Sequence, residues 1–354
     1  MDFLMLFFIY SSIFSSMTFL FYFGNSPTLK HGPIGKVRNF VCDILQEAVD
    51  RVIPQTMVDL VSSLIAYIFY QKNIVMQAMF GILVLMGHII YVMDVLPLLY
   101  MFNPDQNNVL FAMFLAFTNL YFFNKTCVSD PGEITSSNHS KYLKLYPADG
   151  SYYQNRTICR TCHFVKPARS KHCSLCDKCV YRFDHHCIWA NNCVGMWNLR
   201  YFILYLFSLE MMFLNGAFAG VWSLNLFVAN SHLSEASYVA SDGSVRPITV
   251  FVLLQHLFMT FPRVVFLVFS LSVCFLWVGG FFVYHMFLIL TNQTTNERYK
   301  LGSLMPPETN DEGASGDIQT TSGGSQIYRP YDSGMLQNLR EVFFPRCLLR
   351  TKTD

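Results

Sequence analysis

Five apolar runs most constrain what this 354-residue chain can fold into. Each approaches or exceeds the roughly 20 helical residues that cross a bilayer core. The runs cover residues 3–23, 74–96, 108–123, about 201–228 and about 264–290. Charged residues make up only 14% of the chain, against about 25% in ordinary soluble domains. The sequence therefore predicts an all-α polytopic membrane protein with about five transmembrane helices.

Two further apolar segments are too short to span. Residues 57–70 predict an interfacial helix. Residues 249–261 are separated from the last span by Pro262 and predict an interfacial or re-entrant lead-in. The first run has no basic segment before it and no obvious cleavage site, so it predicts a signal anchor rather than a cleaved signal peptide.

Lys and Arg residues concentrate on one side of the predicted spans. Three segments on that side carry 21 of them, whereas two segments on the other side carry only Arg246. The first three are residues 24–73, 126–198 and 291–354, and the other two are residues 100–107 and 230–250. Because basic residues accumulate on the cytoplasmic side, the residues around position 170 and the C-terminus are predicted to face the cytosol. The N-terminus is predicted to lie on the opposite side.

This topology divides the chain into six segments. They are an N-terminal anchor (1–24), a cytosolic or interfacial segment (25–73), the second and third spans (74–125), a cytosolic cysteine-rich domain (126–200), the fourth and fifth spans (201–290) and a cytosolic tail (291–354). Residues 302–326 of the tail are rich in Gly, Ser and Thr and predict a flexible tether. The four glycosylation sequons fall on the cytosolic side and are expected to be unused; they begin at Asn124, Asn138, Asn155 and Asn292.

Ten potential metal ligands follow one ordered pattern between residues 159 and 193. Seven cysteines and three histidines read Cys-x2-Cys-x9-His-Cys-x2-Cys-x2-Cys-x4-Asp-His-His-Cys-x5-Cys. Two closed tetrahedral zinc sites take eight ligands. In a reducing compartment, paired Cys-x2-Cys spacings indicate metal rather than disulfides. The pattern therefore predicts a small double-zinc domain with two ligands left over.

One arrangement of these ligands builds two filled Cys3His sites. The first would use Cys159, Cys162, His172 and Cys179, and the second Cys173, Cys176, His186 and Cys193. Filled sites are structural, because a catalytic zinc keeps a position open for water. Spacing alone does not select this interleaved arrangement, which rests partly on the resemblance described below.

His185 and Cys187 remain outside that arrangement. A thiolate is the reactive form of cysteine, and an adjacent histidine lowers the pKa of a thiol. Asp184 can hold His185 in one tautomer and stabilise its charged form. A nucleophilic thiol close to a membrane span suits a substrate with a long acyl chain. The alternative is that Cys187 is a spare zinc ligand or an inert buried thiol.

The segment around Asp184-His185-His186-Cys187 resembles the cysteine-rich domain of the DHHC protein S-acyltransferases, or palmitoyltransferases. The resemblance covers roughly residues 108–343. The motifs that carry it are Asp130-Pro131-Gly132, Lys166-Pro167-x-Arg169, Asn191-Asn192-Cys193-Val194-Gly195, Asn198-x3-Phe202, Thr294-Thr295-Asn296-Glu297, and Asn338 with Phe343. Two features depart from the family pattern: Ile188 stands where many members have proline, and five spans are predicted instead of the common four.

The resemblance implies a two-step reaction. Cys187 would attack the thioester of a fatty acyl-CoA and form an acyl-enzyme, from which a cysteine of a client protein takes the acyl group. His185 would be the general base, oriented by Asp184. Thr295 would contact that aspartate, and Trp189 would lie by the acyl thioester. The implied partners are acyl-CoA, cysteine-containing clients at the cytosolic membrane face and the bilayer, with no nucleic acid; the implied cofactors are two structural zinc ions.

Two predictions rest on weaker signals. Arg350 and Lys352 near the C-terminus resemble a dilysine retrieval signal, which predicts the endoplasmic reticulum, with the Golgi and the plasma membrane as alternatives. Basic residues around the zinc domain are candidates to meet CoA phosphates or anionic lipid, and an ordinary solvated surface is the alternative; they are Lys166, Arg169, Lys171, Lys178 and Arg182.

Two readings of single residues and one rival class remain open. Glu210 lies inside a predicted span and is a candidate functional acid, whereas His285 is expected to be a packed, neutral histidine. The competing class is a membrane adaptor that is stabilised by zinc and does no chemistry.

Overall fold

A computed structural model of the chain describes residues 32–103, 108–150, 152–154, 156–239, 243–304 and 329–345, with several positions between 9 and 20. The predicted first span lies mostly outside these residues, as do most of the Gly/Ser/Thr-rich tether, the Asn155 sequon and the basic C-terminal end. The chain separates into two compact units, residues 1–71 and 72–354.

In the first unit, the structure describes two consecutive helices in full, and these two meet at a proline. Helix α2 spans Pro33–Val52 and begins with a proline, whose missing N–H costs nothing at a first helical position. Helix α3 spans Gln55–Tyr70 and has no buried residue. The short apolar run at residues 57–70 is therefore a helix. Its interfacial placement stays a prediction.

Three helices among the described residues are long and apolar enough to cross a membrane. The first runs continuously over Val75–Phe102 and is built from α4 (Val75–Ile90), a π-turn (Tyr91–Val95) and α5 (Leu96–Phe102). The π-turn comes just before Pro97, whose ring and missing N–H interrupt α-helical hydrogen bonding. The other two helices are α8 (Leu199–Asn230) and α10 (Pro262–Leu290). These three helices cover the predicted second, fourth and fifth runs.

The predicted third span is a helix with polar interruptions. Helix α6 spans Asn108–Val128 but is not among the three helices that are apolar enough to cross. Asn119 in its middle is fully buried, and its amide nitrogen donates to the Tyr205 carbonyl at 3.3 Å and to the Ser208 hydroxyl at 3.1 Å. This pair of bonds fixes α6 against α8.

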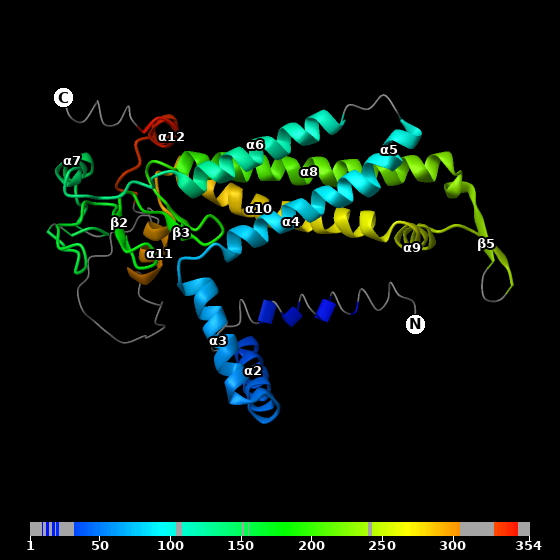
Figure 1. Cartoon of the computed structure of the whole chain (residues 1–354), viewed down its shortest axis with the longest axis horizontal. Helices are drawn as coiled ribbons and strands as arrows, with labels where there is room; N and C mark the ends of the chain where they lie inside the picture. Colours follow the sequence, from blue (N-terminus) through cyan, green and yellow to red (C-terminus); the bar gives the residue numbers. More distant parts are fainter. Residues whose placement is uncertain are drawn as a thin grey trace, which may run out of the picture. The chain divides into compact units, whose positions relative to one another are not determined.

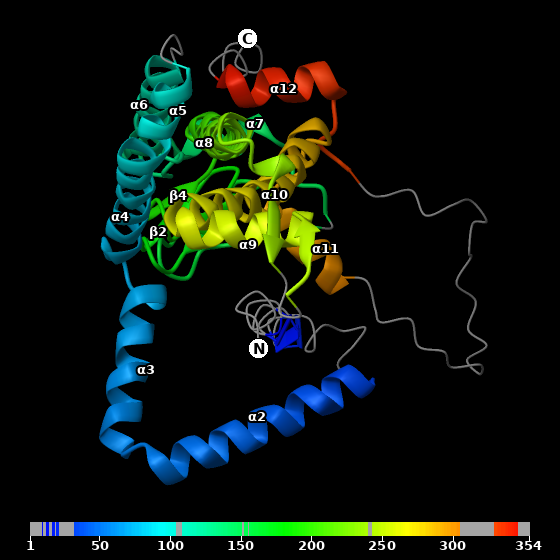
Figure 2. The ribbon, with the colours of Figure 1, turned by 90° about the vertical axis from the view of Figure 1, so that its right-hand side faces the viewer.

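Helix α8 is the centre of the bundle in the second unit, with α6 and α10 running alongside it (Figures 1 and 2). Two glycines let α8 approach α10 closely. A Cβ atom at Gly216 would lie 2.7 Å from Leu271, and one at Gly220 would lie 2.4 Å from Val268. Larger residues there would push the two helices apart.

Glu210 also lies in the contact between α8 and α10. The residue is 6% exposed, and its Oε1 has no hydrogen-bond partner. A Cβ atom at Gly279 of α10 would stand 3.2 Å from the other carboxyl oxygen. Gly279 therefore provides the space that this buried acid occupies.

The cysteine-rich segment gathers at one end of the bundle and contains two short hairpins (Figure 1). Strand β1 (Lys171–Cys173) pairs with β2 (Lys178–Val180), and β3 (His185–Cys187) pairs with β4 (Asn192–Val194). A third hairpin, β5 (Ser237–Val239) with β6 (Val245–Pro247), lies at the other end of the bundle. The all-α expectation missed these strands, since runs of three residues are too short to show a strand pattern.

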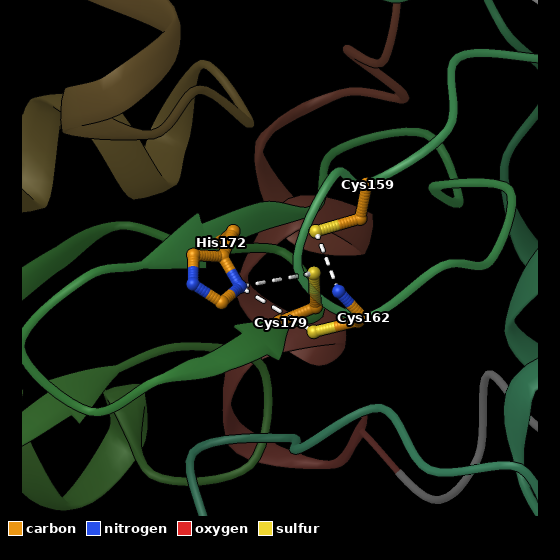
Figure 3. A group of neighbouring side chains, drawn as sticks. All are labelled: Cys159, Cys162, His172 and Cys179. Carbon is orange, nitrogen blue, oxygen red and sulfur yellow. Dashed lines mark hydrogen bonds between the residues drawn. The ribbon is translucent and has the colours of Figure 1, made fainter.

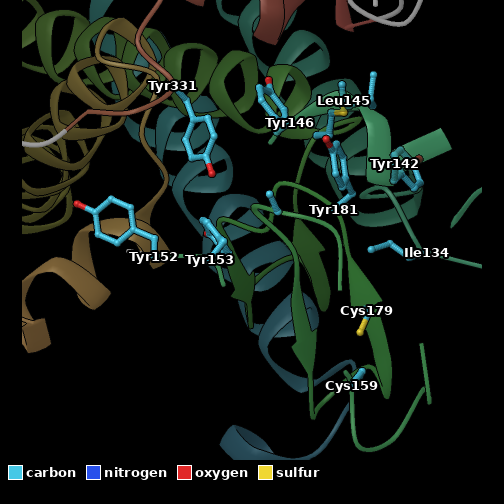
Figure 4. Packing of buried hydrophobic residues seen from close by; sticks show 12 residues of the cluster. Ile134, Tyr142, Leu145, Tyr146, Tyr152, Tyr153, Cys159, Cys179, Tyr181 and Tyr331 are labelled. Carbon is cyan, nitrogen blue, oxygen red and sulfur yellow. The ribbon is translucent and has the colours of Figure 1, made fainter. Parts of the chain in front are cut away.

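The described part of the second unit also contains four shorter α-helices and one 3-10 turn at Leu233–Glu235; the helices are α7 (His139–Leu145), α9 (Val250–Thr260), α11 (Thr295–Leu304) and α12 (Met335–Phe343). Helix α9 covers the predicted apolar lead-in. A buried cluster rich in tyrosine joins the region around α7 to the cysteine-rich segment and to the residues before α12 (Figure 4). Its rings include Tyr142 stacked on Tyr181 at 4.4 Å between centroids, and Tyr331.

Candidate active site and metal centres

The first group of potential metal ligands comes from one hairpin and the loop before it. Cys159, Cys162, His172 and Cys179 offer four ligand atoms within 4.8 Å of one another (Figure 3). His172 and Cys179 are directly paired across β1 and β2. The hairpin therefore brings together two ligands that are seven positions apart in the sequence. The Cys-x2-Cys loop supplies the other two.

The second group repeats this arrangement on the second hairpin. Cys173, Cys176, His186 and Cys193 also lie within 4.8 Å of one another. His186 pairs with Cys193 across β3 and β4. Nδ1 of His186 lies 3.4 Å from the Cys176 sulfur and 3.6 Å from the sulfurs of Cys173 and Cys193. Three thiols and one imidazole nitrogen in each group fit the ligand set of a closed zinc site.

Asp184, His185 and Cys187 lie outside both groups. Nδ1 of His185 donates to Oδ2 of Asp184 at 2.7 Å. Asp184 is 3% exposed and Cys187 is 9% exposed. The bond from Nδ1 leaves Nε2 of His185 as the nitrogen that can exchange a proton with a reacting group.

The three groups shift each other's pKa. Burial raises the pKa of Asp184, but the hydrogen bond and positive charge of His185 outweigh burial and hold the pKa at about 2. For His185, burial lowers the pKa, whereas the contacts with Asp184 and Cys187 raise it to about 10. Burial also raises the pKa of Cys187, yet His185 and backbone amides bring it below its ordinary value. The arrangement favours a thiolate beside an imidazolium.

Thr295 holds the carboxylate from the other side. Its backbone N–H donates to Oδ1 of Asp184 at 2.9 Å, and its hydroxyl donates to Oδ2 at 2.8 Å. Thr295 is the first residue of α11, just beyond the end of the α10 span. The aspartate is therefore fixed by the segment that follows the last span as well as by its own hairpin.

Trp189 follows β3 and is 37% exposed. Its backbone amide and that of Ala190 favour the charged form of Cys187 and lower the thiol pKa. The carbonyl of Ala190 accepts a bond of 3.0 Å from the side chain of Gln77 in α4. The turn after Cys187 is thus tied to a membrane helix, and contact between the indole and an acyl thioester stays a prediction.

Cys187 belongs to a buried apolar cluster that continues into the bundle. The cluster contains Phe202, Leu206 and Leu209 of α8, with Val278 and other residues of α10 packed against it. The ring of Phe202 lies 5.1 Å from that of His185. An apolar environment of this kind suits a hydrocarbon chain leading away from a thiol at the end of the helices.

Gly195 and Asn198 connect the second hairpin to α8. A Cβ atom at Gly195 would lie 2.4 Å from the carbonyl oxygen of Pro131, so only glycine allows this approach. The side chain of Asn198 accepts from the Gly195 N–H at 2.9 Å and donates to the Cys193 carbonyl at 2.8 Å. Gly195 and Asn198 therefore hold the second hairpin against the start of α8.

Two of the basic residues proposed to meet CoA are buried instead. Arg169 has no exposed surface; it donates to both carboxyl oxygens of Glu297 at 2.8 and 2.9 Å. Arg182 is 1% exposed and donates to Asn292. Lys178 pairs with Glu133 at 2.8 Å. The expectation of CoA contact is therefore wrong for both arginines, whose side chains bind groups in the interior of the protein.

Two residues near the site were not predicted from the sequence as part of it. His285 is buried, as expected, but one of its ring nitrogens lies within 4.8 Å of ligand atoms of Asp184 and His185. Asn292 connects Arg169 and Arg182 to the C-terminal segment. The only local signal was the glycosylation sequon at Asn292; the residue is 1% exposed, which agrees with an unused sequon.

The long apolar helices are those of a membrane protein, and its cysteine-rich segment supplies two sets of residues that fit metal ligands. Comparison with known proteins gives the family. The profile of the DHHC palmitoyltransferase domain matches residues 152–302. The chain belongs to the DHHC palmitoyltransferase family, as the motifs indicated.

Several curated relatives match almost the whole chain. Palmitoyltransferase ZDHHC4 of Bos taurus is 34% identical over 346 residues, which cover 98% of this chain and 97% of the relative. Palmitoyltransferase ZDHHC4 of Mus musculus is 36% identical over 357 residues, with the same coverage of 98% and 97%. Palmitoyltransferase swf1 of Schizosaccharomyces pombe is 30% identical over 370 residues and 98% of each chain. The likeness therefore extends beyond the cysteine-rich domain to the helices and the tail.

Proposed function

We propose that this palmitoyltransferase moves a long-chain acyl group from acyl-CoA to cysteine thiols of client proteins through a thioester on Cys187. The observation that carries this proposal is the Asp184–His185 hydrogen bond beside a buried thiol, with eight other cysteine and histidine residues grouped separately. A thiol that is not needed for metal and has a lowered pKa is suited to nucleophilic attack.

The first step loads the enzyme. The Cys187 thiolate attacks the carbonyl carbon of the acyl-CoA thioester, and the bond between that carbon and the CoA sulfur breaks. CoA leaves as a thiolate and takes a proton from the His185 imidazolium. Asp184 keeps Nδ1 of His185 occupied, so that Nε2 is the nitrogen that gives up the proton.

The second step transfers the acyl group. Neutral His185 accepts the proton of a client thiol, and the resulting thiolate attacks the carbonyl carbon of the Cys187 thioester. The bond to the Cys187 sulfur breaks, and the thiolate–imidazolium pair is restored. Asp184 stabilises the charged imidazole at this point.

The eight grouped ligands are proposed to hold two zinc ions. Each group supplies four protein ligands, which makes a closed site whose role is to stabilise the fold. In this proposal zinc fixes both hairpins, the second of which carries His185, His186 and Cys187, and the acyl transfer uses only side chains.

The topology and location follow the charge distribution. We infer five spans in the six segments given above, with the cysteine-rich domain and the tail in the cytosol. Burial of Asn292 and the hydrogen bonds of Asn138 support unused sequons at these two sites. Residence in the endoplasmic reticulum rests on the basic C-terminal end, and replacement of Arg350 and Lys352 by serine with imaging of the cell tests it.

Labelling with an alkyne-tagged palmitoyl-CoA tests the acyl-enzyme. The purified wild-type protein is expected to take up the label in a form that hydroxylamine removes, and Cys187→Ser is expected to take up none. Cys127→Ser is the matched control, because Cys127 is a nearby thiol outside both metal groups. A zinc-stabilised adaptor, the rival class, would show no hydroxylamine-sensitive label in any of the three proteins.

A further inference from the structure

Asn292 occupies the turn between the last membrane helix and α11. It is 1% exposed and has a φ angle of 46°. Asparagine is one of the few residues other than glycine that adopts this left-handed conformation readily. The turn places its side chain in the interior, where every polar atom of the side chain has partners.

The oxygen of the Asn292 side chain faces two arginines of the cysteine-rich domain. Oδ1 accepts from Nη1 of Arg169 and from Nη2 of Arg182, both at 2.8 Å. Arg169 also donates to the backbone carbonyl of Asn292 at 2.8 Å and pairs with Glu297. The Arg169 guanidinium lies between the rings of Tyr146 and Tyr331, 4.9 and 4.5 Å from their centroids.

The nitrogen of the same side chain faces the C-terminal segment, residues 329–345. Nδ2 donates to the carbonyl of Tyr331 and to Oε2 of Glu341 in α12, both at 2.8 Å. Glu341 is 4% exposed and also accepts from the Tyr146 hydroxyl at 2.7 Å. One amide group therefore joins the cysteine-rich domain on one side to the C-terminal segment on the other.

The turn at Asn292 is followed closely by Thr295, which holds the Asp184 carboxylate through two hydrogen bonds. The N–H of Thr294 donates to Oε2 of Glu297 at 2.9 Å, and the N–H of Glu297 donates back to the Thr294 hydroxyl at 3.2 Å. Thr295 lies between these two residues and bonds both oxygens of Asp184. The path from Glu341 runs through hydrogen bonds of buried groups as far as Thr294, and the next residue in the chain, the half-buried Thr295, completes it with its two bonds to Asp184.

We infer that Asn292 is a positioning residue, which converts docking of the C-terminal segment into the correct orientation of Asp184 and so into reactivity of Cys187. The inference rests on the proposed function of Cys187. It predicts that loss of the Asn292–Glu341 bond slows acyl loading even when the fold and the metal content are intact.

Exchanging the hydrogen-bond donor and acceptor between residues 292 and 341 tests whether their bond, rather than packing alone, is required. Asn292→Asp keeps the acceptor for both arginines but sets a carboxylate against Glu341 at the 2.8 Å contact. Glu341→Gln then supplies an amide that can donate to the new carboxylate. A packing role predicts that the two changes add, whereas a specific hydrogen bond predicts that the second change rescues the first.

Two rates are measured for each variant: single-turnover loading of Cys187 by palmitoyl-CoA, and alkylation of Cys187 by iodoacetamide, located by peptide mass spectrometry. We expect Asn292→Asp to slow both roughly tenfold, as expected for loss of a hydrogen bond to a charged group. We expect Asn292→Asp with Glu341→Gln to recover both rates to within about threefold of Glu341→Gln alone. Zinc content and the melting temperature show whether each variant is folded.

Asn292→Gly is a second variant in case the aspartate does not fold. Glycine adopts the same positive φ angle without strain, so this change removes only the side chain. Asn296→Asp is the matched control for rescue, because Asn296 is a buried amide in the same segment whose Nδ2 has no partner among the described residues. Glu341→Gln is expected to leave the Asn296→Asp rates unrescued.

Wild-type rates in Asn292→Asp and Asn292→Gly would overturn the inference, as would an additive double variant. The proposed function has a separate outcome. If wild-type protein were alkylated at Cys187 but never loaded with acyl there, the acyl-enzyme proposal would fail, and the alkylation rates would still decide the role of Asn292.

Discussion

Thr295 binds both carboxyl oxygens of Asp184, through its backbone N–H at 2.9 Å and its hydroxyl at 2.8 Å. The two residues are 111 positions apart in the chain. Their contact connects the segment after the last span to the hairpin that carries the reactive thiol. Correct chemistry at Cys187 should therefore depend on Thr295 through the orientation of Asp184.

The Thr295 hydroxyl can be removed without changing the shape of the side chain. Thr295→Val keeps the backbone bond to Asp184 and loses the side-chain bond, so we expect acyl loading to slow by roughly tenfold, in line with one hydrogen bond to a charged group. Thr295→Ser keeps the hydroxyl and should load close to the wild-type rate. Equal rates in Thr295→Val and Thr295→Ser would mean that the hydroxyl does not contribute to acyl loading.

The alkylation of Cys187 should depend on pH in a way that Asp184 sets. His185 lowers the pKa of Cys187; burial lowers the pKa of His185, but Asp184 and Cys187 together raise it to about 10. Asp184→Asn removes that negative charge, so the pKa of His185 falls and the pKa of Cys187 rises. The profile of iodoacetamide alkylation against pH should shift to higher pH in Asp184→Asn. An unchanged midpoint would mean that the carboxylate does not act through His185.

The buried Arg169–Glu297 pair should contribute to stability far more than an exposed pair. Arg169→Ala leaves Glu297 as a buried carboxylate without its cation, which costs about 3–5 kcal/mol. Lys178→Ala is the control, because Lys178 pairs with the partly exposed Glu133 and such pairs contribute about 0–1 kcal/mol. Thermal unfolding in detergent should separate the two variants clearly. Similar melting temperatures would contradict the buried position of Arg169.

Metal content provides an independent check on the two ligand groups. Purified protein should contain two zinc ions per chain. Cys173→Ala should lower that content and destabilise the cysteine-rich domain, because structural zinc contributes folding free energy. Elemental analysis that returned one ion, or four, would be incompatible with two closed Cys3His sites.

The sequence alone predicted features that depend on local spacing. Long apolar runs predicted three helices of membrane length, and ligand spacing together with the family resemblance predicted the same eight residues that the structure brings together in two groups. The hairpins that carry these ligands were missed because each strand has only three residues. Hydrogen bonding across each hairpin, not strand propensity, decides that part of the fold.

Long-range contacts were beyond the reach of the sequence. Arg169 was a candidate to meet CoA or anionic lipid, because a buried arginine needs a partner and its partner Glu297 lies 128 residues away. Asn292 and Glu341 are 49 residues apart, and neither belongs to a pattern that pairs them. Only the folded chain shows that these groups compensate one another in the interior.

The most direct test of the account is to locate the acyl group itself. Wild-type protein is mixed with palmitoyl-CoA, quenched in acid within one turnover, digested and mapped by tandem mass spectrometry. The account predicts a palmitoyl thioester on Cys187, removed by hydroxylamine, with Cys127 and the eight grouped cysteine and histidine ligands unmodified. A thioester on any other cysteine, in wild-type protein with intact zinc, would contradict the assignment of Cys187 as the acyl carrier.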